Sequence, residues 1–332
     1  MQQRNLLLRL GVGGVGALWV CGELLDLSAA LGQSVGIGVR SSRETKHMLV
    51  AESLPKQLAF TVTSRSRFDL GSTGLTEWPG ARVLLQHVTD TMPLTAGGTL
   101  LEIGSGVGTA AVGIALAAEA AAACSGVVGA EPLRVVATDV DEAALALLRH
   151  NASQSDCGEL LRVEHWDAAT GCGGLKSLPV PLSCLTHVVG SDVVYFGGAH
   201  DAASAGLVPT LAALLEAQPL LDITLVCMER FPVERGRDPA LLMLEEQCRA
   251  AGLHVSRQRV PKQTVHRVQE AQRVLLRVAW QMYGLWDSIW IYKIRRLASG
   301  ECGEEDISLR GELSARHAPL LTDDQFWADR WS

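Results

Sequence analysis

The sequence has 332 residues, which is enough for one large domain or two small ones with a sizeable buried core. Hydrophobic residues make up 48% of the chain and charged residues 20%, which excludes an intrinsically disordered protein. The net charge of −7 disfavours a protein that mainly grips the nucleic-acid backbone, because such proteins usually present a basic face. We therefore expect no nucleic-acid partner.

The eight cysteines are too few for a disulfide scaffold in a chain of this length. No two of them form a Cys-x-x-Cys pair, and structural zinc sites usually draw their ligands from closely spaced pairs. We predict no metal site. We interpret the cysteines as reduced, mostly buried thiols of a cytoplasmic protein.

Residues 1–54 are predicted to be an N-terminal extension. Its apolar stretch Leu10–Cys21 has twelve residues, whereas a helix needs about 20 to span a bilayer, so we expect no membrane association. A secretory signal would avoid a charge such as Arg9 next to its apolar run. A cytoplasmic location is favoured, and organellar import directed by this extension is the alternative.

The extension also contains a GxGxxG pattern at Gly11–Gly16, which is the spacing of a dinucleotide-binding turn. Asn5–Leu10 would be the strand before the turn, and Ser34–Val39 the second strand of such a unit. That second strand runs into Arg40 and offers no acid for a ribose hydroxyl. A dinucleotide site here remains a weak alternative.

From about residue 97 the chain alternates short β-rich runs with longer helical ones. The strands are predicted at Thr99–Ile103, Arg134–Thr138, Leu161–His165, Thr186–Gly190, Ile223–Met228, His254–Val260 and Ile289–Ile294. The helices are predicted at Thr109–Cys124, Glu142–Asn151, about 200–218, and Pro239–Ala251. This alternation predicts an α/β, Rossmann-like fold: a seven-stranded, mainly parallel sheet with helices on both faces and an antiparallel closing strand pair.

The domain is predicted to cover residues 55–296, with an insertion at 261–288 between its last two strands. Within the insertion, Val265–Met282 has apolar residues at helical spacing and predicts an amphipathic helix. Core packing is its expected task, and binding of a partner is the alternative. The polar residues 297–332 are predicted to form a C-terminal tail that is partly disordered or lies on the surface.

An acid followed by glycines at every second position marks the end of the first predicted parallel strand, at Glu102–Gly108. Glycines allow a positive φ and leave room for a ligand beside the backbone. A GxGxxG motif starting at Gly104 would need a third glycine at position 109, which is Thr109. The charge of Glu102 suits a cationic ligand better than a pyrophosphate. The pattern fits S-adenosylmethionine, whose amino group and sulfonium are positive.

Acids also follow the next two predicted strands. Asp139 comes at the end of the second strand, where ribose hydroxyls need acceptors; the alternative is that it only caps the next helix. Trp166 and Asp167 follow the third strand, where an indole can stack on adenine and a carboxylate can accept from its amine. The alternative is a core tryptophan beside a capping aspartate.

Three further segments carry a resemblance to a known family. They are Thr73–Ala81, which contains Glu77-Trp78-Pro79; Val188–Tyr195, with Asp192 and Tyr195 in an Asp-x-x-Tyr pattern; and Ile223–Arg230. With the glycine loop, they resemble the class I S-adenosylmethionine-dependent methyltransferases, and more narrowly the protein-lysine methyltransferases of methyltransferase family 16. The likeness covers about residues 55–295, and the first forty residues and the long insertion have no counterpart in it.

The resemblance implies methyl transfer from S-adenosylmethionine to a lysine of a protein substrate. It places the cofactor against Trp78, Gly104, Ser105, Gly106, Asp139, Trp166 and Ser191, and the acceptor against Asp192 and Tyr195. The residue patterns described above add Glu102, Gly108 and Asp167 to the predicted cofactor site. A monomer is expected, because no heptad run or pairing helix is visible in the sequence.

A lysine acceptor agrees with the chemistry of the Asp-x-x-Tyr pattern. A lysine with a pKa of about 10.4 must lose its proton before it attacks, and Asp192 is suited to binding the ammonium and orienting the amine. Tyr195 adds a hydroxyl and an aromatic wall that tolerates a methylated cation. The alternatives are a strand-end Asp192 that caps a turn, with Tyr195 in the core; a class I methyltransferase acting on a small amine, another side chain or RNA; and a non-catalytic binding protein.

Overall fold

The computed structural model describes residues 42–49, 54, 57–65, 73–194, 200–229, 238–265 and 288–296. The Gly11–Gly16 motif, Tyr195 and the tail at 297–332 lie outside the described residues. So does the predicted helix Val265–Met282, apart from its first residue.

Seven strands form one sheet in the order β5-β4-β3-β6-β7-β9-β8. Their bounds are β3 Thr99–Ile103, β4 Arg134–Asp139, β5 Leu161–His165, β6 Leu185–Ser191, β7 Asp222–Met228, β8 Leu253–Arg259 and β9 Ile289–Arg296. The five strands from β5 to β7 are parallel to their neighbours, and β9 runs antiparallel to β7. The predicted fold class is therefore confirmed, including the reversed strand near the closing edge.

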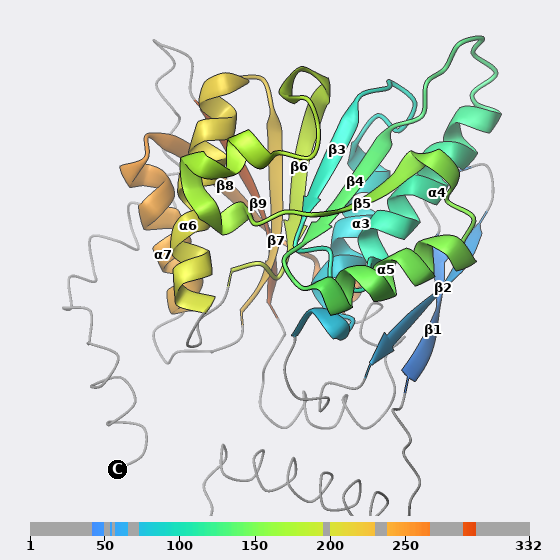
Figure 1. Cartoon of the computed structure of the whole chain (residues 1–332), viewed down its shortest axis with the longest axis horizontal. Helices are drawn as coiled ribbons and strands as arrows, with labels where there is room; N and C mark the ends of the chain where they lie inside the picture. Colours follow the sequence, from blue (N-terminus) through green and yellow to red (C-terminus); the bar gives the residue numbers. More distant parts are fainter. Residues whose placement is uncertain are drawn as a thin grey trace, which may run out of the picture. The chain divides into compact units, whose positions relative to one another are not determined.

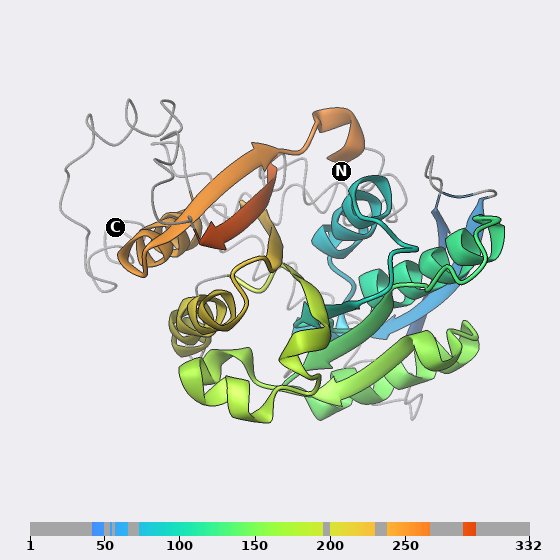
Figure 2. The same cartoon turned by 90° about the horizontal axis from the view of Figure 1, so that it is seen from above.

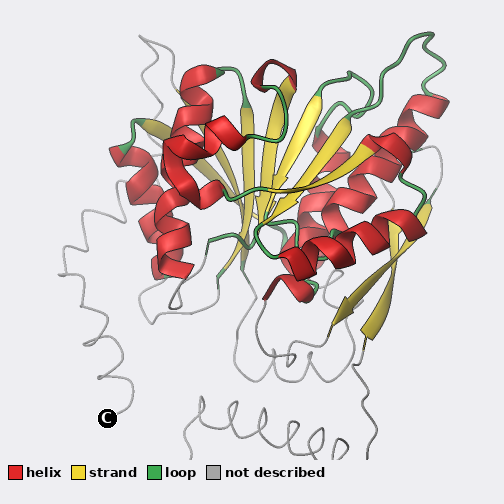
Figure 3. Ribbon diagram, in the orientation of Figure 1, coloured by secondary structure: helices red, strands yellow, loops and turns green. Residues whose placement is uncertain are grey.

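Five helices accompany the sheet in the described part of the chain, and Figure 3 shows helices on both of its faces. They are α3 Pro79–Thr91, α4 Thr109–Cys124, α5 Glu142–Gln154, α6 His200–Ala217 and α7 Pro239–Ala250. Short 3-10 turns occur at η1 Thr73–Leu75, η2 Gly158–Leu160, η3 Ala168–Ser177 and η4 Leu182–Cys184. Strands β3 and β5 and helix α4 have the bounds predicted from the sequence. No residue range was predicted for α3.

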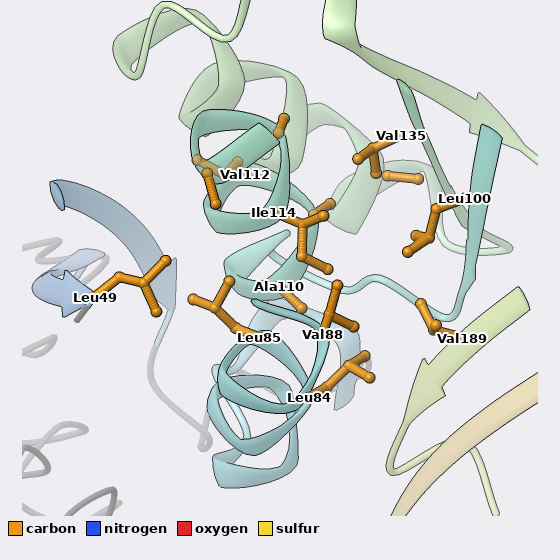
Figure 4. Packing of buried hydrophobic residues seen from close by; sticks show 14 of the residues in the cluster. Leu49, Leu84, Leu85, Val88, Leu100, Ala110, Val112, Ile114, Val135 and Val189 are labelled. Carbon is orange, nitrogen blue, oxygen red and sulfur yellow. The ribbon is translucent and has the colours of Figure 1, made fainter. Parts of the chain in front are cut away.

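Alternate side chains of the central strands enter two separate cores. Leu100 of β3 packs with residues of α3 and α4, including Leu84 and Ile114 (Figure 4). Its neighbour Leu101 faces the other way and packs with Leu211 of α6 and residues of α7. Because successive strand residues point to opposite faces, a strand buried on both sides has to be apolar throughout, as β3 nearly is. Glu102 is the exception.

A two-stranded antiparallel hairpin precedes the sheet and was not foreseen from the sequence. It consists of β1 Ser42–Leu49 and β2 Leu58–Arg65, paired along their whole length. Phe60 and Val62 of β2 are buried in the same core as α3 and α4. Figures 1 and 2 show the hairpin beside α4 and α5, and both helices contact β2. Strand β1 belongs to the predicted extension, so the pairing joins the two sides of the predicted boundary at residue 54.

The first core offers a simple test of packing. Leu100 is 0% exposed and Leu220 is 96% exposed. Replacing Leu100 with Ala should lower the free energy of unfolding by about 2–5 kcal/mol, because it removes buried methyl groups and leaves a cavity. The same replacement at Leu220 should change it by less than about 0.5 kcal/mol. Denaturant titrations of both variants measure these differences, and equal effects would contradict the assigned core.

Candidate active site

The loop Gly104–Gly108 joins β3 to α4 in a conformation that requires glycine. Gly104 and Gly106 have φ angles of 62° and 53°, in the left-handed region that side chains rarely adopt. A Cβ at Gly104 would lie 2.7 Å from Val193 Cγ1, and one at Gly106 would lie 3.0 Å from the carbonyl oxygen of Gly74. The positive φ angles agree with the glycine pattern of the sequence. The space beside Gly104 and Gly106 is taken by two other segments of the chain, whereas the sequence pattern was interpreted as leaving room for a ligand.

The contacts of this loop bring the predicted residues to one edge of the sheet. Ile103 lies opposite Thr138 of β4 and Gly190 of β6, so these three parallel strands end side by side. Asp139 is the last residue of β4, Asp192 directly follows β6, and Glu102 is in β3 itself. The turn η1 lies against the same loop through Gly74. Carboxyl ends of parallel strands are where ligands bind in open α/β sheets.

Asp139 is tied to the glycine loop by its carboxylate. Its Oδ2 accepts from the backbone N–H of Gly106 at 2.9 Å, and its Oδ1 accepts from that of Asp141 at 3.0 Å. Burial raises the pKa of this carboxyl, and these backbone hydrogen bonds act in the opposite direction. The helix cap of α5 is Asp141, whose side chain accepts from Ala143 N, so the capping alternative for Asp139 is filled by a different residue.

Glu102 is a buried carboxyl group with an incomplete set of partners. It is 1% exposed, and its Oε2 has no hydrogen-bond partner among the described residues. Its pKa is raised to about 8, mainly by burial; the charge of Asp139 also raises it, and hydrogen bonds from Ser105 and Ala111 lower it. Such a group in a strand end is unfavourable for folding alone and indicates a site for a positively charged ligand.

The raised pKa of Glu102 predicts how the stability of the ligand-free protein depends on pH. The native state holds this proton more tightly than the unfolded chain, whose carboxyl has a pKa of 4.5. The contribution to stability is therefore complete below pH 4.5 and is lost as the pH rises through about 8. Glu102→Gln should flatten the decline that wild type shows over this range in denaturant titrations.

A matched control is Glu164→Gln on the edge strand β5, where the glutamate side chain is 38% exposed and faces Arg162. This variant should keep the wild-type pH dependence. An unchanged slope in Glu102→Gln would show that Glu102 titrates normally. His47 also changes stability with pH, between its unfolded pKa of 6.5 and the value of about 4 to which burial lowers it. Because wild type and both variants keep His47, this contribution cancels when their slopes are compared.

Asp192 has a strained backbone and a buried carboxylate. It is 7% exposed, has a φ of 55° and is one of two non-glycine residues with positive φ in the described chain. Its Oδ1 accepts from Met228 N of β7 at 3.2 Å. Its carboxylate lies against Gly80 in the first turn of α3, where a Cβ would overlap it. The positive end of a helix dipole favours a carboxylate there. Its predicted partner Tyr195 lies outside the described residues.

Three other predicted residues line this edge in supporting roles. Trp78 is half-buried at the start of α3, and its Nε1 donates to the carbonyl of Thr73 at 2.9 Å. Ser105 is bound to β4, because its Oγ accepts from Thr138 N at 3.1 Å and its backbone N donates to Thr138 O. Ser191 is the last residue of β6, half-buried and paired with Val226. Their contact with a cofactor stays a prediction.

Trp166 and Asp167 match the alternative prediction for this pair, a tryptophan in the core beside an aspartate that caps a helix. Trp166 is 3% exposed in the core beside Leu101 and Val136, and its Nε1 donates to Gly174 O at 3.0 Å. This geometry gives no support to stacking of its indole on adenine. Asp167 caps η3 by accepting from Ala169 N at 2.8 Å, and the half-buried carboxylate keeps lone pairs for another donor.

Two buried polar groups near this edge were not predicted from the sequence. Glu77 and Arg82 form a buried two-point ion pair, with His47 of β1 beside them. Asn151 of α5 is 1% exposed and joins β2 to the glycine loop. A charged pair five residues apart was the only local signal for the first group. Nothing near Asn151 in the sequence indicated its partners.

Two searches of the described residues found nothing. They contain no group of three or more histidine, cysteine, aspartate or glutamate side chains arranged to hold a metal ion. None of their helices is long and apolar enough to cross a membrane.

No protein-family model matches the sequence, and no curated protein matches it. Solved structures with similar folds include a SAM dependent methyltransferase from Aquifex aeolicus, at 14% identity and a TM-score of 0.41, covering 65% of this chain and 93% of that one. Another is the ribosomal protein L11 methylase from Lactobacillus delbrueckii, at 10% identity and a TM-score of 0.38, covering 65% of this chain and 77% of that one.

A third is precorrin-6y C5,15-methyltransferase from Geobacter metallireducens, at 13% identity and a TM-score of 0.40, covering 68% of this chain and 93% of that one. By their names, the second of these proteins methylates a ribosomal protein and the third methylates precorrin-6y. At TM-scores below 0.5 the similarity carries no argument about ligand or acceptor, so the residues of the site have to supply it.

Proposed function

We propose that the chain is a methyltransferase that uses S-adenosylmethionine and transfers its methyl group to a lysine side chain of a protein. The observation that carries the proposal is the pair of buried carboxyl groups, Glu102 and Asp139, on either side of the glycine loop at the carboxyl edge of a parallel sheet. The cytoplasmic location, the monomeric state and the protein partner stay predictions.

The residues present fit this cofactor. Glu102 has one buried oxygen without a partner, which suits the cationic end of an amino-acid group. Each carboxylate oxygen of Asp139 accepts one hydrogen bond from a backbone N–H. Each oxygen has a further lone pair, so the carboxylate can also accept from two ribose hydroxyls.

The bound cofactor would supply a methyl group already activated by a sulfonium. The protein then has to hold the acceptor in line with that carbon and keep water away from it. Asp192 and the residues around Gly80 are suited to this task, because a carboxylate held in a strained conformation by Met228 and α3 keeps its position. No strong base is required of them.

A negative charge at this position supports a cationic acceptor. Asp192 lies two strands from Asp139 in the order β4-β3-β6, so the acceptor pocket that we propose adjoins the cofactor residues. Lysine has to lose a proton before it attacks, and a carboxylate binds its ammonium and then orients its amine. A planar amide or nucleobase gains nothing comparable from this charge.

Binding measurements test the cofactor assignment directly. We expect S-adenosylhomocysteine to bind the purified protein in a calorimeter, with no heat of binding from NAD. Asp139→Ala should weaken the binding at least about tenfold, because it removes charge-assisted hydrogen bonds. Asp222→Ala serves as the control, because Asp222 stands at the other end of the sheet, at the start of β7, and its carboxylate is bound by Lys293. Absence of binding by wild type would refute the proposed cofactor.

Transfer of a labelled methyl group tests the acceptor. Incubation of a cell lysate with protein and radiolabelled cofactor should place label in a protein band and, after hydrolysis, in methyl-lysine. Asp192→Asn should reduce this transfer about 100-fold, because the ammonium loses its counter-charge and its position. The variant should still bind S-adenosylhomocysteine, since asparagine tolerates a positive φ and can accept from Met228 N.

Asp238→Asn is the matched control for that change. Asp238 is 3% exposed and caps α7 through Ala240 N, so it is a buried aspartate of the same kind outside the proposed site. It should keep wild-type transfer. Label in RNA or in a small amine would exclude the lysine acceptor while leaving the methyltransferase intact. Full transfer by Asp192→Asn would exclude Asp192 from the acceptor site.

A further inference from the structure

The hairpin β1–β2 is bonded to the glycine loop through a single side chain. Asn151 of α5 accepts from Thr63 N at 2.9 Å and donates to Thr63 O at 2.9 Å, so it completes both backbone groups of one β2 residue. The same amide donates to the carbonyl of Val107 at 2.8 Å. Val107 lies between Gly106 and Gly108, which makes Asn151 a direct bridge from the hairpin to the loop.

A second connection runs from β1 to the segment that precedes α3. His47 is stacked on Phe60, with ring centroids 4.9 Å apart, and its Nε2 packs 3.2 Å from Glu77 Oε1 without a hydrogen bond between them. Burial lowers the pKa of His47 to about 4, so this contact joins a neutral imidazole to the carboxylate at neutral pH. Arg82 holds that glutamate at two points, Nε to Oε1 at 2.8 Å and Nη2 to Oε2 at 3.1 Å. All three charged or titratable side chains are at most 8% exposed, so the pairing is largely shielded from water.

Both connections lead to the backbone of the glycine loop. Glu77 stands directly before Trp78, and the segment continues back to Gly74, whose carbonyl faces Gly106. The glycine loop is therefore held from one side by Asn151 and from the other by the segment that Glu77 fixes. Glycines in a loop have the largest conformational freedom to lose, so such a loop keeps one shape only when its neighbours impose it.

We propose that the hairpin β1–β2 is a clamp that holds the glycine loop and the Thr73–Trp78 segment in the arrangement required for cofactor binding, with Asn151 and Glu77 as positioning residues. The inference rests on the proposed function. It assigns a task to a strand of the predicted extension. Neither side chain has to touch the cofactor, since each acts through the backbone it holds.

The test measures backbone protection in the ligand-free protein together with cofactor affinity. Asn151→Leu keeps the size of the side chain and removes all three hydrogen bonds, and Glu77→Gln keeps the shape of the pair but removes its charge. Hydrogen exchange followed by mass spectrometry reports on peptides covering residues 73–82 and 102–112. Calorimetry gives the dissociation constant for S-adenosylhomocysteine. Glu77→Gln serves if Asn151→Leu folds poorly.

The control is Tyr292→Phe, which removes a buried hydrogen bond to Glu245 between β9 and α7. It should lower the melting temperature and leave both the exchange of residues 102–112 and the dissociation constant unchanged. In both clamp variants we expect residues 102–112 to exchange faster than in wild type. We also expect the dissociation constant for S-adenosylhomocysteine to rise at least about tenfold, although the melting temperature falls no further than that of the control.

Exchange of residues 102–112 at the wild-type rate in both variants would overturn the clamp, even if both proteins were less stable. An unchanged dissociation constant with faster exchange would also overturn it, because the held arrangement would then not be needed for binding. Failure of wild type to bind S-adenosylhomocysteine would refute the proposed cofactor, and the exchange rates would still decide whether the hairpin holds the loop.

Discussion

Four segments of the chain meet at the carboxyl edge of the sheet. They can approach one another because Gly104 and Gly106, in the loop after β3, carry no side chains. The turn η1, the end of β4 and the residues after β6 all approach Gly104 or Gly106 within contact distance. A methyl group at either glycine would have to displace its neighbours and adopt an unfavourable φ. The loop therefore determines how far apart the acids of the site lie.

This close packing of segments also buries carboxyl groups, and burial makes their charged form less favourable. Glu102 is buried beside Asp139, and burial is the main cause of the raised pKa of both. A folded protein gains nothing in stability from an incompletely bonded acid in its core. A cationic ligand offsets this penalty, so an edge that is unfavourable in the free protein becomes favourable when occupied. This is the usual relation between stability and function at binding sites.

Support for the edge comes from outside the seven-stranded sheet. His47, Glu77 and Arg82 form one buried group between the hairpin and α3, and Asn151 forms another between the hairpin and the loop. Glu77 and Arg82 are bonded to each other at two points, and Asn151 makes three hydrogen bonds, so these side chains favour one arrangement of the segments they join. The hairpin is thereby part of the same unit as the glycine loop.

The sequence by itself determined the succession of strands and helices from β3 onward and the position of the glycine loop, because these follow from patterns within a few residues. Short β-rich runs and an alanine-rich run predicted β3, β5 and α4 at their observed bounds, and the Glu102–Gly108 spacing predicted a loop that needs glycine. Only the tertiary structure decided which polar groups meet. Asn151 and its partner Thr63 are 88 residues apart, and no local pattern encodes such a contact. The burial of Trp166 and the left-handed backbone of Asp192 likewise result from packing against distant elements, which sequence spacing does not reveal.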